Sequence, residues 1–311
     1  MSEVVASLTR AFTLAFVITS MFGLGLGLTL RDIVTPLRNT RLLVLSLVAN
    51  FLLVPAAAWA IARLLGLEPD LRIGLILFSA VAGAPLSLKA AQLARGDVHF
   101  AVSLVTLQVV ATVLFLPFAL PLLIPGVAVD PVALAMPLLL EILLPLGFGL
   151  LMNVRYDEEA EMARPVMATV SNLSLALMLA LNLGNVGRVL GLLGTGAILA
   201  TILLILVGFA AGWLLGGPDV RTRRTLSLGT AQRNFAAAFV IGGGNFADRP
   251  TVMIMLLAAS LVSIAIILPA AGEIGRRART AAGARPAGGE LRPAEAHADG
   301  FRGDAGSGAR A

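Results

Sequence analysis

The chain has 311 residues, of which 58% are hydrophobic and only 13% are charged, about half the charged fraction of a soluble domain. This composition indicates an integral membrane protein. The sequence contains no cysteine, which excludes disulfides, thiolate metal sites and cysteine nucleophiles. The net charge of +5 does not indicate nucleic-acid binding, because the arginines lie between hydrophobic runs and in the C-terminal tail.

Nine hydrophobic segments follow one another, and each approaches the roughly 20 residues that a helix needs to cross a bilayer. We therefore predict an all-α membrane protein with nine transmembrane helices and one transmembrane domain over residues 1–272. We expect a disordered cytoplasmic tail over 273–311, which is rich in Arg, Ala, Gly and Pro. The predicted helices are 11–30, 42–62, 73–93, 99–124, 131–153, 165–187, 194–216, 225–246 and 251–271.

The arginines predict the orientation of these helices. They concentrate at one set of segment ends, which includes Arg41, Arg95, Arg155 and Arg221, and are fewer at the opposite set. The positive-inside rule places the first set in the cytoplasm, so the N-terminus is expected outside and the C-terminus inside. We expect the cytoplasmic (inner) membrane of a prokaryote, with the lipid bilayer as the first partner.

Two segments are interrupted by residues that are expected in a membrane only where protein or a water-filled cavity surrounds them. The third segment contains Gly83 and Pro85, and the eighth carries Gln232–Asn234 followed by a run of glycines at 242–244. Interrupted helices at matching places in two halves predict an inverted repeat, with a transport site near the bilayer midplane. The first repeat would cover 11–124, the joining helix 131–153, and the second, inverted repeat 165–271.

Arg233 is the first candidate site residue. Counted along a helix from Arg224 at the predicted interface, it would lie roughly 13 Å deep. It would bind an anion or, alternatively, cap carbonyl groups that the broken helix leaves free. Lys89 is the only lysine of the chain. Counted along a straight helix, it would lie ~9 Å from Arg95 at the predicted interface. A lysine side chain can extend its ammonium group across much of that depth.

Glu141 is the acidic residue of the fifth segment, and intramembrane carboxylates usually face a partner or a cavity. It would couple transport to protons or compete with substrate as a counter-ion. The alternative is a structural salt bridge, with Lys89 or Arg233 as the expected partner, or a protonated acid. Gln108 and Asn50 are isolated polar residues, which bind ligand or join helices by hydrogen bonds.

Nothing in the sequence indicates an enzyme. The two histidines, His99 and His297, are far apart in the chain, so we expect no metal cluster. No nucleophile–base pair lies at membrane depth and no phosphate-binding glycine loop is present. We therefore expect no catalytic residues, no bound metal and no organic cofactor.

Three motifs resemble the bile acid:sodium symporter family over residues of about 10 to 271. They are MFGLGLGLTLRD (21–32), LARGDVHFAVSLVT (93–106) and AQRNFAAAF (231–239). The resemblance implies a panel domain and a core domain, with two broken helices that cross at the midplane. It also implies uptake of an organic anion, coupled to sodium, by alternating access.

The first broken helix departs from the family's sodium ligands. The family carries a serine–asparagine pair there. Counted back from Gly96, Ser87 keeps the serine, but Leu88 replaces the asparagine and Lys89 follows.

The second broken helix departs as well. Anchored on Asn234, the family's glutamate corresponds to Gly229 and its glutamine to Arg233, while Gln232 stands one place early. A sodium site needs oxygen ligands and negative charge, and cationic side chains would repel the ion. We therefore expect Lys89 and Arg233 to act as tethered substitutes for the two sodium ions.

The sequence thus predicts a sodium-independent carrier of a small organic anion, either a facilitator, an exchanger or a proton-coupled carrier that uses Glu141. The first alternative is ordinary sodium symport, in which case sodium is the bound ion. The second alternative is a membrane sensor or scaffold that binds ligand without moving it. A homo-oligomer remains open. In the sodium-symport alternative, the ligands of sodium would be displaced from the family's positions. They would be Ser87, Thr106, Gln108, Thr230 and Gln232.

Overall fold

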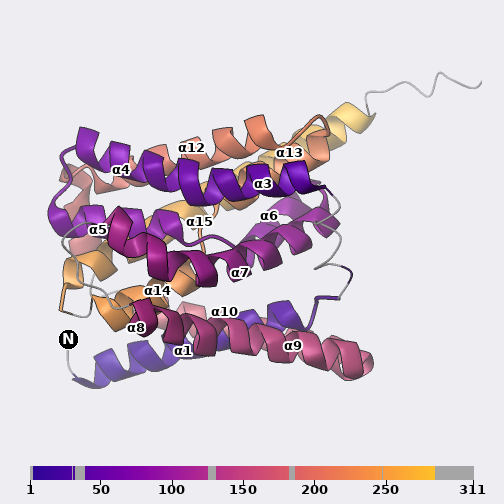
Figure 1. Ribbon diagram of the computed structural model, residues 1–311, viewed down its shortest axis with the longest axis horizontal. Helices are drawn as coiled ribbons and strands as arrows, with labels where there is room; N and C mark the ends of the chain where they lie inside the picture. The colour runs from indigo at the N-terminus through magenta and orange to yellow at the C-terminus, as the bar shows by residue number, and fades with distance from the viewer. Residues whose placement is uncertain are drawn as a thin grey trace, which may run out of the picture.

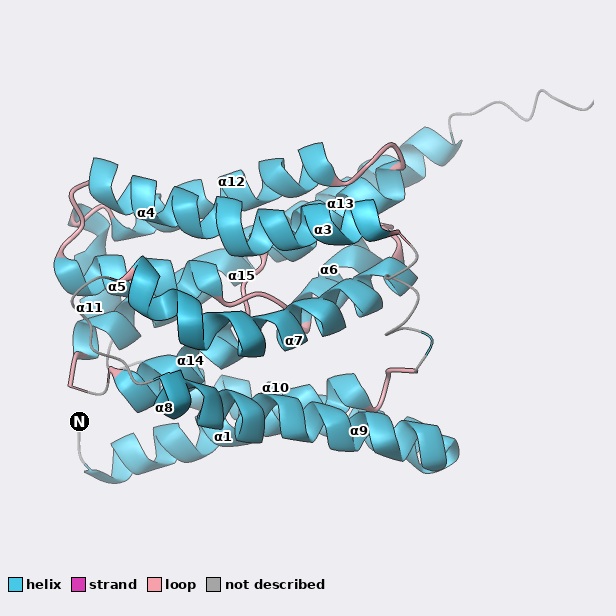
Figure 2. Ribbon diagram, viewed as in Figure 1, coloured by secondary structure: helices cyan, strands magenta, loops and turns pink. Residues whose placement is uncertain are grey.

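The computed structural model describes residues 3–29, 31, 39–124, 131–181, 186–246 and 248–283, and these residues form helices and no strand (Figure 2). The all-helical class predicted from the sequence is therefore confirmed for the described part of the chain. The helices are α1 (Glu3–Gly25), α3 (Thr40–Val48), η2 (Ala49–Leu53), α4 (Val54–Leu64), α5 (Pro69–Ala80), α6 (Leu86–Leu93), α7 (Val98–Leu123), α8 (Pro131–Pro137), η3 (Leu138–Leu143), α9 (Leu144–Arg155), α10 (Asp157–Leu181), α11 (Val186–Gly191), η5 (Leu192–Gly194), α12 (Ala197–Leu215), α13 (Val220–Ala231), α14 (Phe235–Asn245) and α15 (Pro250–Gly283).

Six helices in the described ranges are long and apolar enough to cross a membrane. This finding confirms a multi-pass membrane protein, while the number nine stays a prediction. The three predicted segments outside this set are the two broken helices, α5–α6 and α13–α14, and α10, whose first turn is acidic. The six spans are Ser7–Gly25, Thr40–Leu64, Val98–Leu123, Leu134–Arg155, Ala197–Leu215 and Pro250–Thr280.

The last helix is longer than the sequence predicted. α15 continues to Gly283, past the boundary expected at residue 272. Glu273 forms ion pairs with Arg276 at 2.5 Å and with Arg277 at 2.7 Å, and pairs at this spacing stabilise a helix. Residues 273–283 are therefore helix rather than disordered tail, and residues 284–311 lie outside the described part.

The helices form two groups (Figure 1). In the smaller group, α1 packs against α9 and α10. Gly25 and Gly149 allow a backbone-level contact between α1 and α9. A Cβ at Gly149 would lie 2.9 Å from the backbone nitrogen of Leu26 and closer still to the carbonyl of Phe22, so only glycine fits.

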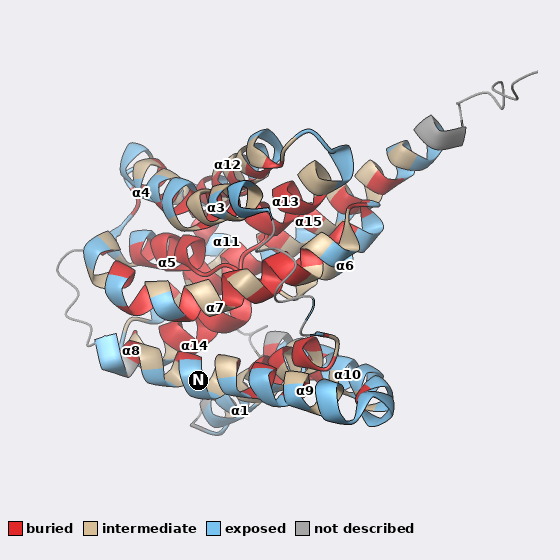
Figure 3. Ribbon diagram, turned by 45° about the vertical axis from the view of Figure 1, so that its right-hand side comes forward, coloured by how far each residue is buried: buried red, intermediate tan, exposed pale blue. Residues whose placement is uncertain are grey.

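The larger group contains the two broken helices. Buried residues concentrate on α5, α7, α13 and α14 (Figure 3). α12 covers α13 closely because Gly208 and Gly212 have no side chains. A Cβ at Gly208 would lie 2.8 Å from the carbonyl oxygen of Thr230. The two breaks, at residues 81–84 and 232–234, are thus buried in protein, as unpaired backbone groups at membrane depth require.

Candidate functional site

The first break separates α5 from α6. α5 ends at Ala80, and Gly83 in the following extended stretch has φ +82°. A Cβ at Gly83 would lie 2.6 Å from the backbone nitrogen of Val109 on α7. The hydroxyl of Thr112, also on α7, accepts a hydrogen bond from the amide of Ala82 at 3.1 Å and donates to its carbonyl at 3.2 Å. α7 therefore satisfies the backbone groups that the break leaves free.

The second break separates α13 from α14 and bonds directly to the first. The backbone amide of Asn234 donates to the carbonyl of Val81 at 3.1 Å, and its side-chain amide donates to the carbonyl of Gly83 at 3.0 Å. The side-chain oxygen of Asn234 also caps α14 by accepting from the amide of Ala237 at 3.1 Å. One asparagine thus starts a helix and joins the two broken helices.

Arg233, beside Asn234, is buried between the ends of α5 and α13. Its guanidinium donates to the carbonyl of Ser79 at 3.0 Å, to the side-chain oxygen of Asn50 at 2.7 Å and to the carbonyl of Thr230. Ser79 and Thr230 lie in the last turns of their helices. Carbonyl groups there lack helical partners and carry the negative end of the helix dipole. The arginine therefore neutralises two helix C-termini at once.

Asn50 holds Arg233 from the neighbouring helix. It lies in the π-helical turn η2, and its side-chain amide donates to the carbonyl of Ser46 at 2.8 Å and to the hydroxyl of Thr230 at 3.2 Å. π-turns inside longer helices frequently mark functional sites. The sequence marks Asn50 only as an isolated amide in an apolar segment, a residue that binds ligand or joins helices.

Other predicted site residues are satisfied inside the bundle. Gln232 accepts from the hydroxyl of Ser263 at 3.3 Å and donates to the carbonyl of Arg233 at 3.2 Å. The hydroxyl of Ser87 donates to the carbonyl of Ala84 at 2.7 Å. Both residues therefore stabilise the broken segments in this structure.

Gln108 differs from these residues. It is fully buried on α7, yet neither its amide nitrogen nor its carbonyl oxygen has a hydrogen-bond partner among the described residues. Buried polar groups are almost always paired. Gln108 therefore has unused hydrogen-bonding capacity in the interior of the bundle.

Lys89 and Glu141 lie apart from Arg233 and its partners. Lys89 is exposed on α6, and within the described ranges it forms no ion pair or hydrogen bond. Glu141 lies in η3 and is half-buried, with Arg10 of α1 as a charge that acts on it. The expected ion pair of Glu141 with Lys89 or Arg233 is not formed in the described part of the chain. The hydrogen bonds of Arg233 go to neutral oxygens instead.

The turn at 93–97 attaches the end of α6 to α13. Arg95 has φ +54°, and a Cβ at Gly96 would lie 2.5 Å from the hydroxyl oxygen of Thr225. The amide of Asp97 donates to the carbonyl of Arg221 at 3.3 Å, and the hydroxyl of Thr225 donates to the carbonyl of Asp97 at 3.1 Å. The motif Leu93–Asp97 is therefore a docking turn between the two broken helices.

The site offers oxygens rather than metal-binding side chains. Among the residues whose structure is described, no group of His, Cys, Asp or Glu could hold a metal ion. Carbonyls at the ends of interrupted helices are groups that coordinate sodium in carriers. Here the carbonyls of Ser79 and Thr230 bind the guanidinium of Arg233.

Interrupted helices that meet inside a membrane bundle are a design of secondary transporters. The chain belongs to the sodium bile acid symporter family, whose model matches residues 14–209. This match confirms the resemblance noted in the sequence, and members of this family are transporters rather than enzymes.

Curated relatives agree with this assignment. The chain is 26% identical over 249 residues to the probable sodium/metabolite cotransporter BASS1, chloroplastic, of Arabidopsis thaliana, which covers 79% of this chain and 62% of the relative. It is 30% identical over 225 residues to the probable sodium/metabolite cotransporter BASS3, chloroplastic, of the same plant. This match covers 70% of this chain and 52% of the relative. It is 27% identical over 202 residues to the uncharacterized sodium-dependent transporter YocS of Bacillus subtilis. This match covers 63% of this chain and 60% of the relative. The chain thus spans between about half and two thirds of the length of these relatives.

Proposed function

We propose that the protein is a secondary transporter of a small organic anion that works by alternating access without sodium. The buried guanidinium of Arg233, bonded to oxygens of Ser79, Thr230 and Asn50, is the observation that carries this proposal. The two broken helices would cross near the midplane of an inverted repeat, in the inner membrane of a prokaryote. The N-terminus would lie outside and the C-terminus in the cytoplasm.

A sodium ion and an arginine differ in one respect that matters for coupling. Both neutralise carbonyl groups at helix ends, but only the ion can dissociate and carry the energy of a gradient. Arg233 is covalently attached to the chain, so the break stays neutralised throughout the cycle. The carrier would therefore run as a facilitator, as an exchanger, or with protons carried by Glu141.

The exposure of Lys89 separates its role from that of Arg233. Lys89 is exposed and bonds to none of the helix-end carbonyls that Arg233 occupies. We therefore assign the sodium-substituting role to Arg233 alone, and we propose that Lys89 contacts the organic anion. Gln108 is the second candidate contact, because both of its polar atoms lack partners within the described residues.

The test is thermal unfolding and liposome counterflow of the purified protein in sodium, potassium or choline. The wild-type protein is expected to bind anions and exchange them equally in all three cations. Arg233→Gln, which leaves the helix-end carbonyls without a cation, should lose stability in potassium and regain part of it in sodium, with a saturable dependence. Arg72→Gln, at an exposed position on α5, is the matched control and should show no sodium response.

The names of the relatives favour ordinary sodium symport as the second candidate. Its shifted ligands would be Thr106, Gln108 and the hydroxyl or amide groups at both breaks. Saturable stimulation of wild-type transport by sodium would establish it and refute the substitution by Arg233. Ligand binding without counterflow in any cation would instead indicate a sensor.

A further inference from the structure

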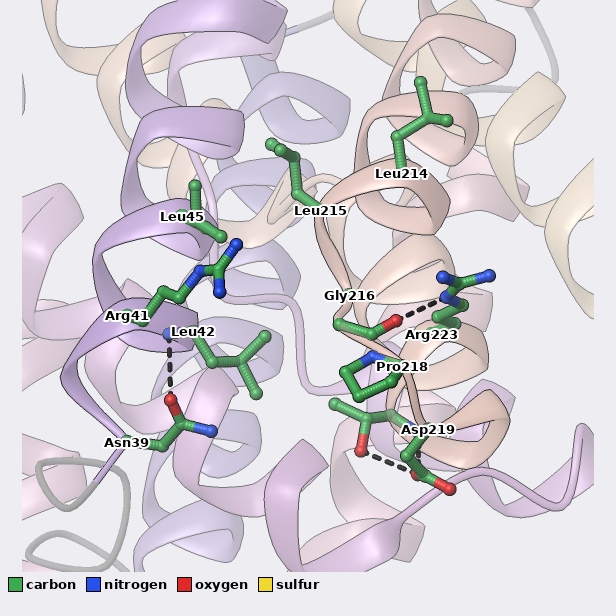
Figure 4. A pocket seen from close by; sticks show the side chains of 12 residues that line it. Asn39, Arg41, Leu42, Leu45, Leu214, Leu215, Gly216, Pro218, Asp219 and Arg223 are labelled. Carbon is green, nitrogen blue, oxygen red and sulfur yellow. Dashed lines mark hydrogen bonds between the residues drawn. The ribbon is translucent and has the colours of Figure 1, made fainter.

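A crevice of about 790 Å³ lies between the start of α3 and the α12–α13 turn (Figure 4). It is at the Arg-rich end of the bundle, which we define as the end where Arg41, Arg95, Arg155 and Arg221 lie. Glycines hold α12 tightly against α13, whereas α12 contacts α4 more extensively than α3. The crevice is therefore the space that opens between α3 and α12 as they approach this end.

Two arginines line the crevice from opposite sides. In Figure 4 the side chain of Arg41 extends from α3 toward the side where Leu215 and Gly216 lie. Arg223 lies beyond the Gly216–Pro218 turn and does not point toward Arg41 (Figure 4). It donates from its Nε to the carbonyl of Gly217, and its guanidinium lies 5.9 Å from the ring centre of Trp213. The position of Arg223 is thus fixed by the turn, while Arg41 is exposed.

The acidic residue of the crevice is already engaged. The carboxylate of Asp219 accepts hydrogen bonds of 2.8 Å from the amide and from the hydroxyl of Thr222. These bonds hold the pKa of Asp219 below its usual range, so the carboxylate stays ionised and caps α13. The lining nevertheless carries more positive than negative charge, with Arg41 and Arg223 against Asp219.

The remaining walls of the crevice are apolar. Leu42 and Leu45 come from α3, and Leu214 and Leu215 from α12. Leu214 is 77% exposed in a helix that is long and apolar enough to span the membrane. A leucine in this position faces lipid, so the crevice combines basic groups at the interface with an apolar wall.

We propose that this crevice binds an anionic glycerophospholipid of the adjacent leaflet, with its phosphate at Arg41 and an acyl chain along the leucines. Basic pockets between helices at a membrane surface bind anionic head groups, and arginine suits phosphate because its planar guanidinium donates two parallel hydrogen bonds. A free phosphate ester would satisfy Arg41 alone. The leucines favour the lipid. The inference does not depend on the transported substrate or on sodium.

The test uses the purified protein in neutral detergent. Phosphatidylglycerol is expected to raise the midpoint of thermal unfolding more than phosphatidylcholine, and to remain bound in native mass spectrometry. Arg41→Gln should weaken the apparent affinity for phosphatidylglycerol about fivefold, as expected for one interfacial arginine. Arg72→Gln removes the same charge from an exposed position on α5 and should leave the affinity unchanged.

Three results would overturn the proposal. They are equal stabilisation by the two lipids, equal loss of affinity in both arginine variants, and full stabilisation by soluble glycerol 1-phosphate, which would assign the site to a free phosphate ester. If Arg41→Gln does not fold, Leu45→Trp provides a second test, because it fills the crevice without changing its charge. This variant should also lose selective binding of phosphatidylglycerol.

Discussion

The guanidinium of Arg233 donates a 2.7 Å hydrogen bond to the side-chain oxygen of Asn50, and both residues are buried. The bond joins the helix that contains η2 to the second break. A buried charge is costly unless its donors are paired. The hydrogen bond to Asn50 therefore lowers the free-energy cost of burying the charge of Arg233.

Replacing Asn50 by alanine should destabilise the protein by about 3 kcal/mol, because a charged donor then loses its buried partner. The measurement is thermal or chemical unfolding in detergent. Asn50→Asp keeps an oxygen acceptor and adds a charge opposite to that of Arg233, so it should retain more stability than the alanine variant. Equal stability of the alanine variant and the wild type would contradict the structural role of this bond.

Gly83→Ala should destabilise the protein by about 3 kcal/mol or more, because strain at positive φ adds to the clash of a Cβ with the backbone of Val109. Gly66→Ala is the control. Gly66 also has positive φ, +60°, but nothing lies within 4 Å of its Cβ position, so the loss should be only about 1 kcal/mol. A similar loss of stability in the two variants would contradict this expectation, because it would mean that α7 moves away from the break at little cost.

Gln108→Leu should raise the free energy of unfolding by about 1 kcal/mol, since it removes a buried amide without partners. Thr112→Val, one turn further along α7, should lower it by about 1 to 2 kcal/mol because the bonds to Ala82 are lost. If Gln108 contacts the anion, the leucine variant should also weaken anion binding. A marked loss of stability in Gln108→Leu would indicate that buried water pairs the amide.

Gly149→Ala should separate α1 from α9, and we expect a loss of about 2 kcal/mol from the forced displacement. Gly147→Ala is a matched control in the same helix, with open space around its Cβ position. It should be neutral or stabilising by about 0.5–1 kcal/mol, because alanine favours helix over glycine. Unfolding midpoints of the two variants, compared side by side, test the contact between α1 and α9.

Much of the site could be predicted from local sequence. Gly83 and the Gln232–Asn234 triplet are conspicuous because lipid tolerates neither free backbone groups nor a guanidinium, and the structure places a break at each. The alternative that Arg233 caps free carbonyls is confirmed by its bonds to Ser79 and Thr230. Its substitution for sodium builds on the same contacts and stays a prediction.

The partners of these residues were harder to predict. Asn50 and Thr230 meet across 180 positions of sequence, and no local pattern encodes such a pairing. The depth of Lys89 could be estimated from the helical rise, but not which side of α6 faces the interior. The neighbour of Glu141 depends on how η3 is rotated against α1, and a π-turn shifts that rotation in a way that apolar spacing does not reveal.

The docking turn at Leu93–Asp97 has a mechanical consequence. It fastens α6 to α13 at the Arg-rich end, while Asn234 fastens the two breaks together further in. Two attachments at different depths brace the broken helices against tilting relative to each other. In a carrier of the proposed kind, opening and closing would therefore occur as a rigid rotation of this braced unit against α1, α9 and α10.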